Sequence, residues 1–297
     1  MQALWMVLAA FLFATMGVCV KAGSAYFNAA ELVCYRGIVS MAILWLLARA
    51  QGVALATRYP GMHAWRSFVG VVALGTWFYS IGHLPLATAM TLNYMSSLWI
   101  AAFLVGGALM AWKPSVSPRP PIQAPLVLTV LAGFVGVVMM LRPSLGGETT
   151  GFASLIGLMS GVAAAFAYMQ VMALSRLAEP ETRTVFYFAV GSTVAGGAAM
   201  TVAGTSPWPG WPALWLLPIG VLAALGQLCM TRAYSRARTP RGTLVVASLQ
   251  YSGIVFAGLY GLLLFGESIP TVGWVGMGLI IASGVAATIL RARGAPN

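Results

Sequence analysis

The chain is poor in charge and contains no aspartate. Of its 297 residues only five are acidic, all of them glutamate, and charged residues together make up 7% of the composition. A soluble chain of this length could not cover a composition that is 60% hydrophobic with so little charge. The composition therefore excludes a soluble globular domain and indicates an integral membrane protein.

The sequence also lacks the motifs on which many enzymes and metal sites are built. It has no P-loop, no GxSxG, no HExxH and no paired carboxylates. Cys19, Cys34 and Cys229 lie in apolar runs and form no CxxC or Cys/His pattern, so we interpret them as small buried residues. We expect no catalysis, no metal and no cofactor.

Ten apolar runs come close to the length of about 20 residues that a helix needs to cross a bilayer. They lie at about 2–21, 29–48, 65–82, 86–111, 125–142, 151–174, 184–204, 213–231, 242–265 and 271–290. We therefore expect an all-α membrane protein with ten transmembrane helices. The fourth and ninth runs are long enough to tilt or bend.

Basic residues indicate the orientation, because Lys and Arg tend to stay on the cytoplasmic side. With the N-terminus inside, the residues on that side are Arg49, Arg58, Arg66, Lys113, Arg119, Arg176, Arg183, Arg232, Arg236, Arg238, Arg241, Arg291 and Arg293. Only Lys21 and Arg142 fall outside. We predict cytoplasmic termini in a bacterial inner membrane, and the net charge of +11 then reflects topology, with no nucleic-acid partner.

A stretch of the first half recurs 155 positions later without a gap. Ten residues of 76–110 are identical in the second copy: Thr76, Tyr79, Ser80, Pro85, Thr88, Ser97, Ala102, Leu104, Gly106 and Leu109 match Thr231, Tyr234, Ser235, Pro240, Thr243, Ser252, Ala257, Leu259, Gly261 and Leu264. A duplicated unit in a hydrophobic chain is typical of secondary transporters that hold their substrate between the halves.

Each copy contains five spans, so the second must enter the membrane from the opposite side. We therefore predict two inverted five-helix repeats, 1–142 and 151–290, joined by an outer linker at 143–150. We interpret the first span as a membrane helix and not as a secretory signal peptide, because it follows Met1-Gln2 without a basic segment or a cleavage site.

Two groups of polar residues, related by the shift of 155, each lie on one face of a long span. They are Asn93, Ser96 and Ser97 in the fourth span and Ser248, Tyr251 and Ser252 in the ninth. Polar groups at this depth must find partners or face a cavity. The two faces either line a central substrate pathway or hold helices together, as small polar residues often do.

Aromatic and amide side chains occur at a similar depth in other spans. We count Trp77, Tyr79, Trp99, Tyr168 and Gln227 as further candidates for the cavity. An amphiphilic ligand needs apolar walls and a few fixed polar contacts. Ordinary packing or lipid contact is the alternative for each aromatic ring.

Arg36 is a basic residue well inside a predicted span. It could attract a carboxylate of a substrate, pair with Glu31, or extend to the interface roughly 10 Å away.

Several short stretches resemble EamA-type permeases of the drug/metabolite transporter superfamily. They are residues 11–21, Cys34-Tyr35-Arg36-Gly37, residues 84–89, Leu264-Phe265-Gly266-Glu267 and the glycine-rich run 273–284. The resemblance covers nearly the whole chain. It implies two inverted five-helix repeats, alternating access, and a cavity bordered by the third, fourth, eighth and ninth spans. The fourth span departs from the pattern, since it ends in Met110-Ala111-Trp112-Lys113.

These observations favour a secondary transporter that exports small metabolites, with amino acids the leading class and aromatic or bulky apolar ones the best fit. We expect a small-molecule substrate and lipid as its partners, and a monomer. An uptake carrier or exchanger for an anionic or nucleotide-linked metabolite is the alternative, with Arg36 as the anion contact. A non-transporting membrane scaffold is the alternative of a different class.

Overall fold

The computed structural model describes residues 2–96, 98–100, 102–103, 124–141, 148–237, 246 and 249–294. In these ranges the regular structure is helical. The elements are α1 (Gln2–Gly23), α2 (Ala29–Ala50), α3 (Pro60–His83), α4 (Leu86–Tyr94), α6 (Ala124–Leu141), α7 (Glu148–Arg176), α8 (Glu181–Ala203), η2 (Trp211–Trp215), α9 (Leu216–Arg236), α11 (Ser252–Phe265) and α12 (Thr271–Gly294).

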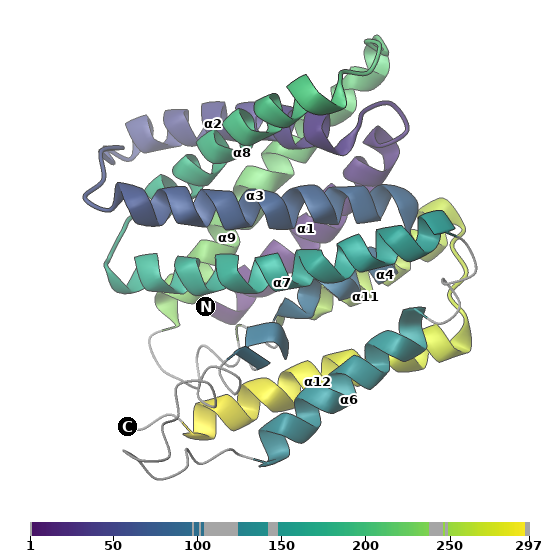
Figure 1. Cartoon of the computed structure of the whole chain (residues 1–297). Coiled ribbons are helices and arrows are strands. Elements are labelled where there is room, and N and C mark those ends of the chain that lie inside the picture. The colour runs from purple at the N-terminus through teal and green to yellow at the C-terminus, as the bar shows by residue number, and fades with distance from the viewer. Residues whose placement is uncertain are drawn as a thin grey trace.

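The long helices pack side by side in one bundle (Figure 1). The pair α2 and α8 lies at one edge, the pair α6 and α12 at the opposite edge, and α1, α3, α7 and α9 lie between them. The most extensive contacts join α2 to α8, α12 to α6, α3 to α7 and α1 to α9. In each of these four pairs, one helix lies within residues 1–142 and the other within 148–294.

Five of the described helical segments are long and apolar enough to cross a membrane: Gln2–Gly23, Ala29–Ala50, Thr150–Arg176, Glu181–Ala203 and Trp211–Arg236. Two shorter segments are also apolar: Ser252–Phe265, which is α11, and Thr271–Ala286, which is part of α12. The chain is thus an all-helical, multi-pass membrane protein. The count of ten spans, and the cytoplasmic termini, stay predictions.

Local sequence signals explain where several helices begin and end. Asn28 caps α2 in a capping box, in which its side chain accepts from the Glu31 amide while the Glu31 carboxylate accepts from the Asn28 amide. Pro60 occupies the first turn of α3, where its missing N–H costs nothing. Gly266 ends α11 in the left-handed conformation, with φ of 58°.

The fourth and ninth runs, predicted to be long enough to bend, are interrupted. Helix α4 ends at Tyr94 and is followed by a turn at Met95, while Gln250 and Tyr251 form a turn before α11. The two interruptions lie 155 positions apart in sequence and touch in space. Tyr94 packs against Gly253, where a Cβ atom would lie 2.7 Å from the Tyr94 hydroxyl oxygen.

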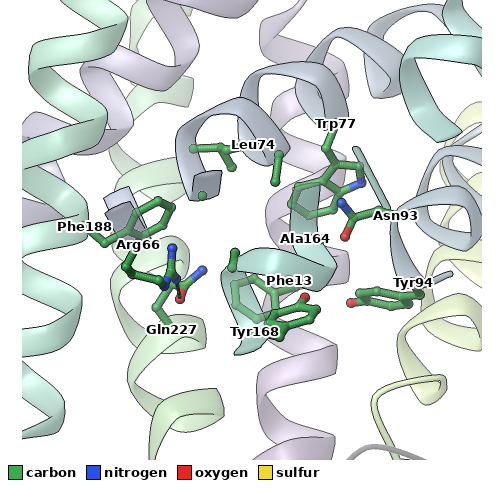
Figure 2. Close-up of a pocket in the computed structure, with 13 residues that line it drawn as sticks. Phe13, Arg66, Leu74, Trp77, Asn93, Tyr94, Ala164, Tyr168, Phe188 and Gln227 are labelled. Atoms are coloured by element: carbon green, nitrogen blue, oxygen red, sulfur yellow. Dashed lines mark hydrogen bonds between the residues drawn. The ribbon is translucent and has the colours of Figure 1, made fainter. Parts of the chain in front are cut away.

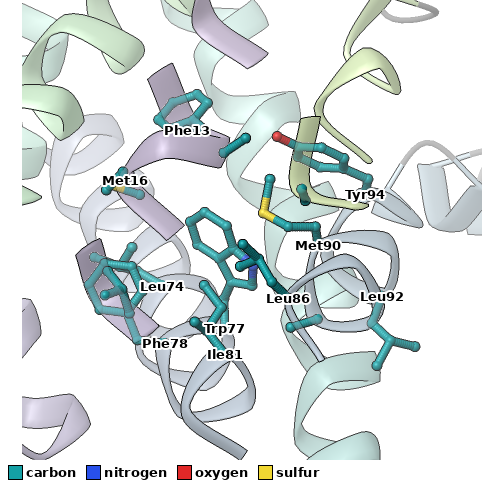
Figure 3. Packing of buried hydrophobic residues seen from close by; sticks show 14 of the residues in the cluster. Phe13, Met16, Leu74, Trp77, Phe78, Ile81, Leu86, Met90, Leu92 and Tyr94 are labelled. Carbon is teal, nitrogen blue, oxygen red and sulfur yellow. The ribbon is translucent and has the colours of Figure 1, made fainter. Parts of the chain in front are cut away.

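Close packing rather than apolar burial holds such helices together, because lipid is as apolar as a leucine side chain. Gly37 and Gly196 let α2 and α8 approach closely: a Cβ atom at Gly196 would lie 2.6 Å from the backbone nitrogen of Cys34. In the centre, Phe13 of α1, Trp77 of α3 and Met90 of α4 belong to one buried cluster (Figure 3).

Candidate functional site

A small cavity lies at the centre of the bundle (Figure 2). Its volume of about 50 Å³ has room for a few water molecules. Helices α1, α3, α4, α7, α8 and α9 contribute its walls. The lining residues are Phe13, Arg66, Gly70, Ala73, Leu74, Trp77, Asn93, Tyr94, Ala164, Ala167, Tyr168, Phe188 and Gln227.

One end of the cavity holds a buried guanidinium group. Arg66 is 4% exposed, and its Nη2 donates to the side-chain oxygen of Gln227 on α9 at 3.4 Å. The guanidinium lies alongside Gly70, one turn further along α3, and a Cβ atom at Gly70 would overlap it. The absence of a side chain at Gly70 therefore makes the room that Arg66 occupies.

A second buried arginine lies beside the first. The Cζ atoms of Arg66 and Arg36 lie 4.1 Å and 5.1 Å from the centroid of the same ring, that of Phe188 on α8. Arg36 also donates from Nη1 to the hydroxyl of Ser192, at 3.3 Å. The two guanidinium groups are thus at most about 9 Å apart, and they repel each other by about 2 kcal/mol at an effective dielectric constant near 20.

No carboxylate balances these two charges among the residues that the structure describes. The acidic contacts of basic side chains are Lys21–Glu267, His63–Glu179, Arg183–Glu179 and Arg232–Glu181. The predicted option of a pair between Arg36 and Glu31 is not formed: Glu31 instead accepts from Asn28 and from Ser206. Arg36 and Arg66 are therefore held by neutral groups and one aromatic ring.

The other end of the cavity carries neutral polar groups. Asn93, at the end of α4, donates from its amide to the Ser160 hydroxyl of α7 at 3.2 Å. The indole nitrogen of Trp77 and the hydroxyl of Tyr94 are buried and have no hydrogen-bond partner within the described part of the chain. Buried donors without partners are costly, so both are suited to meet a ligand.

Tyr168 connects the cavity wall to the interruption before α11. Its hydroxyl accepts from the side-chain nitrogen of Gln250 at 3.0 Å, and the Gln250 oxygen accepts from Tyr234 of α9 at 3.3 Å. A change of conformation at this interruption would therefore reach the cavity through Tyr168.

Four of the residues predicted from sequence line the cavity: Trp77, Asn93, Tyr168 and Gln227. Six others do not belong to its lining: Arg36, Tyr79, Ser96, Trp99, Tyr251 and Ser252. Ser97 and Ser248 lie outside the described residues. Tyr79 stacks on His83 with ring centroids 4.2 Å apart, and Trp99 packs on Phe134 at 4.9 Å.

Arg66 lines the cavity but is not among the site residues predicted from the sequence, where it serves only as a charge on the predicted cytoplasmic side. The third run was predicted to begin at residue 65, whereas α3 begins at Pro60. Arg66 is therefore six residues into the helix, about 9 Å from its start. Pro60, ahead of the apolar run, is the sequence signal that the helix begins earlier and that Arg66 lies within it.

The cavity is too small for a metabolite as it stands, since ligand pockets measure about 300–1,000 Å³. A compound larger than a few waters could enter only after the surrounding helices moved apart. The site combines one cationic end, neutral donors at the other end, and apolar walls from Phe13, Leu74 and Trp77. It can therefore recognise an amphiphilic molecule by both its charge and its apolar part.

Known proteins that resemble the chain are membrane transporters. It is 34% identical over 269 residues to the pseudopaline exporter CntI of Pseudomonas aeruginosa, and the matched region covers 88% of this chain and 86% of the exporter. An uncharacterized transporter of Helicobacter pylori is 28% identical (94% and 91% covered), and a riboflavin transporter of Rhizobium johnstonii is 27% identical (95% and 88%). No protein-family model matches.

A solved crystal structure shares the fold. Its TM-score is 0.64 at 19% identity, with 99% of each chain covered. The identity to the pseudopaline exporter extends over most of both chains, and it agrees with the apolar helices and the central cavity described above. The chain is a membrane transporter that belongs to the drug/metabolite transporter superfamily.

Proposed function

We propose that this protein is a secondary transporter of the bacterial inner membrane that exports a small metabolite, namely an amino acid or a compound that contains one. The observation that carries the proposal is the central cavity, in which buried donors of Trp77 and Tyr94 are left without partners inside a transporter fold. A substrate that binds there would supply the missing acceptors.

Alternating access between two inverted repeats, 1–142 and 151–290, is the transport mechanism that we propose. The pairs in which the helices pack support this mechanism. A two-fold axis would exchange α1 with α7 and α3 with α9, and it would therefore turn the α1–α9 pair into the α7–α3 pair; both pairs are among the most extensive. The interruptions at Met95 and Gln250, 155 positions apart, give further support.

Export of amino acids rests on the chemistry of the cavity and on one relative. The mixture of guanidinium, amide and aromatic groups suits a molecule with charged and apolar parts, and the P. aeruginosa relative is named as an exporter. That name does not favour the alternative of an uptake carrier. The named transporters also argue against a non-transporting scaffold.

Counterflow in liposomes tests the proposal. Purified protein is reconstituted with an unlabelled amino acid inside, and uptake of the same labelled compound is followed for each of the twenty amino acids. We expect exchange that saturates with concentration for at least one aromatic or bulky apolar amino acid. No exchange of any of the twenty, by protein shown to be folded and inserted, would rule out the amino-acid version.

Riboflavin is a second candidate, because two relatives, from R. johnstonii and Vibrio cholerae, are named riboflavin transporters. The flat aromatic surfaces of Phe13, Trp77 and Tyr168 could accept its ring system. Labelled riboflavin in the same liposomes distinguishes the two candidates: exchange of riboflavin without exchange of any amino acid would replace the first proposal by the second.

A further inference from the structure

We propose that Arg66 is the residue that binds a carboxylate of the transported compound, so that this protein carries small organic acids with an apolar or aromatic part. The inference rests on the proposed transport function, and it deepens it by assigning a charge to the substrate. It also assigns a role to Arg36, which lies next to the cavity without lining it.

The first argument is that Arg66 has donors to spare at the cavity. Its Nη2 donates to Gln227, while Nε and Nη1 are buried and lack a partner among the described residues. The planar guanidinium group presents its N–H donors in a geometry that matches the two oxygens of a carboxylate. Figure 2 shows this group and Gln227 together at one end of the cavity.

The second argument is electrostatic. A buried charge needs an opposite charge or several hydrogen bonds. Glu31, Glu179, Glu181 and Glu267 are each engaged elsewhere. Arg36 of α2 is 2% exposed and adds a second positive charge near the Phe188 ring. Both charges favour an anion over a neutral ligand at this end.

The third argument is that the position of Arg66 is built into the fold. Its guanidinium occupies the space that the missing side chain of Gly70 leaves open, and it lies against the Phe188 ring. Between Arg66 and the neutral polar groups at the far end, Phe13, Leu74 and Ala164 supply apolar walls. This arrangement fits a carboxylate attached to an apolar group better than a compact, multiply charged phosphate.

Binding of matched acids and amides tests the inference directly. The probes are benzoate, 3-phenylpropionate and phenylalanine, each compared with its own amide, and titrated into detergent-purified full-length protein by calorimetry. We expect at least one acid to bind about tenfold or more tightly than its amide. Inorganic phosphate and phenyl phosphate form a second arm, and tighter binding of phenyl phosphate than of every acid would overturn the carboxylate assignment.

Substitutions locate the preference. Arg66→Gln should reduce the preference for acid over amide to less than about twofold. Arg66→Lys should retain only part of this preference, because the charge remains while the planar arrangement of guanidinium donors is lost. Gly70→Ala keeps Arg66 but displaces its guanidinium, so it should also reduce the preference for acid over amide. Arg49→Gln is the matched control: Arg49 also lies over an aromatic ring, that of Trp45, but is exposed.

Thermal unfolding without ligand separates binding from a structural role. A residue that holds the fold together lowers Tm when it is replaced, whereas removal of a buried charge without a partner raises it. We expect Arg66→Gln to have a higher Tm than the wild type and to have lost its acid preference. A lower Tm with the preference retained would overturn the inference.

The two proposals fail in different ways. Exchange in liposomes with no preference of the wild-type protein for any acid over its amide overturns the carboxylate site and leaves transport intact. A clear acid preference that is lost in Arg66→Gln, without exchange of any amino acid in liposomes, supports the site and contradicts the proposed export of amino acids.

Discussion

Positive charges occur in two contrasting settings in this protein. Near the C-terminal end of α1, Lys21 lies 2.6 Å from a Glu267 carboxylate oxygen and donates to the Leu84 carbonyl at 2.7 Å, and the same carboxylate accepts from the Leu86 amide at 2.8 Å. At the centre of the bundle, Arg36 and Arg66 have only neutral partners among the described residues. Both settings are largely shielded from solvent.

The difference shows which charges serve the structure. Lys21 and Glu267 join the end of α1, the turn between α3 and α4, and the end of α11, so their energy is used in holding one arrangement of the helices. Arg66 lines the cavity and has donors left over. An arrangement that evolution had shaped for stability alone would have supplied a carboxylate or an apolar residue there.

The largest effect should follow from giving Arg66 the carboxylate that it lacks. In Gln227→Glu the new carboxylate occupies the place of the present amide, 3.4 Å from Nη2. We expect the ion pair to raise Tm and to lower transport about a hundredfold, because the internal acid competes with the substrate. Counterflow and thermal unfolding measure the two effects.

Gln227→Asn is the control for this change, since it shortens the side chain without adding charge. It should lower transport far less than Gln227→Glu. Equal losses in the two variants would mean that packing at Gln227, rather than charge at Arg66, limits transport.

Breaking the pair at the end of α1 should affect stability more than substrate selection. Glu267→Gln removes the negative charge, and we expect unfolding to cost about 2 kcal/mol less, in the range for hydrogen bonds to charged groups. A double-mutant cycle with Lys21→Gln, followed by denaturant unfolding, measures the coupling. Additive effects of the two substitutions would show that the pair contributes no energy of its own.

A smaller effect is expected at the neutral end of the cavity. Trp77 and Trp99 both have a buried indole nitrogen without a partner in the described structure, but only Trp77 lines the cavity. Trp77→Phe should lower transport about fivefold, which corresponds to about 1 kcal/mol for one hydrogen bond. Trp99→Phe should leave it nearly unchanged; the reverse order would favour the sequence-based assignment of Trp99.

The smallest effect is expected at a more exposed ion pair. Arg232 lies 2.9 Å from Glu181, and its side chain is 38% exposed. Such pairs contribute about 0–1 kcal/mol. Arg232→Gln should therefore lower the free energy of unfolding by no more than about 1 kcal/mol and leave transport intact. A loss of transport comparable with that of Gln227→Glu would place a functional charge outside the cavity.

Much of the candidate site was within reach of the sequence, for identifiable reasons. Asn93 and Gln227 were found because polar side chains are rare within apolar runs, and each is conspicuous there. Trp77 and Tyr168 were found by depth, but depth alone cannot separate them from Tyr79 and Trp99, which lie on other faces and pack against neighbouring rings. The rotation of each helix about its own axis decides whether a side chain faces the cavity or packs against a neighbouring ring.

The sequence by itself determined the helical membrane class and the approximate positions of the helices, and it predicted the duplication, because apolar run length and residue identity are local properties. Only the tertiary structure decided that Arg66 and Arg36 both lie against the Phe188 ring, with no ion pair to either one among the described residues. These contacts join α2, α3 and α8, which are far apart in the chain. Their geometry depends on how the helices pack, and no single segment encodes it.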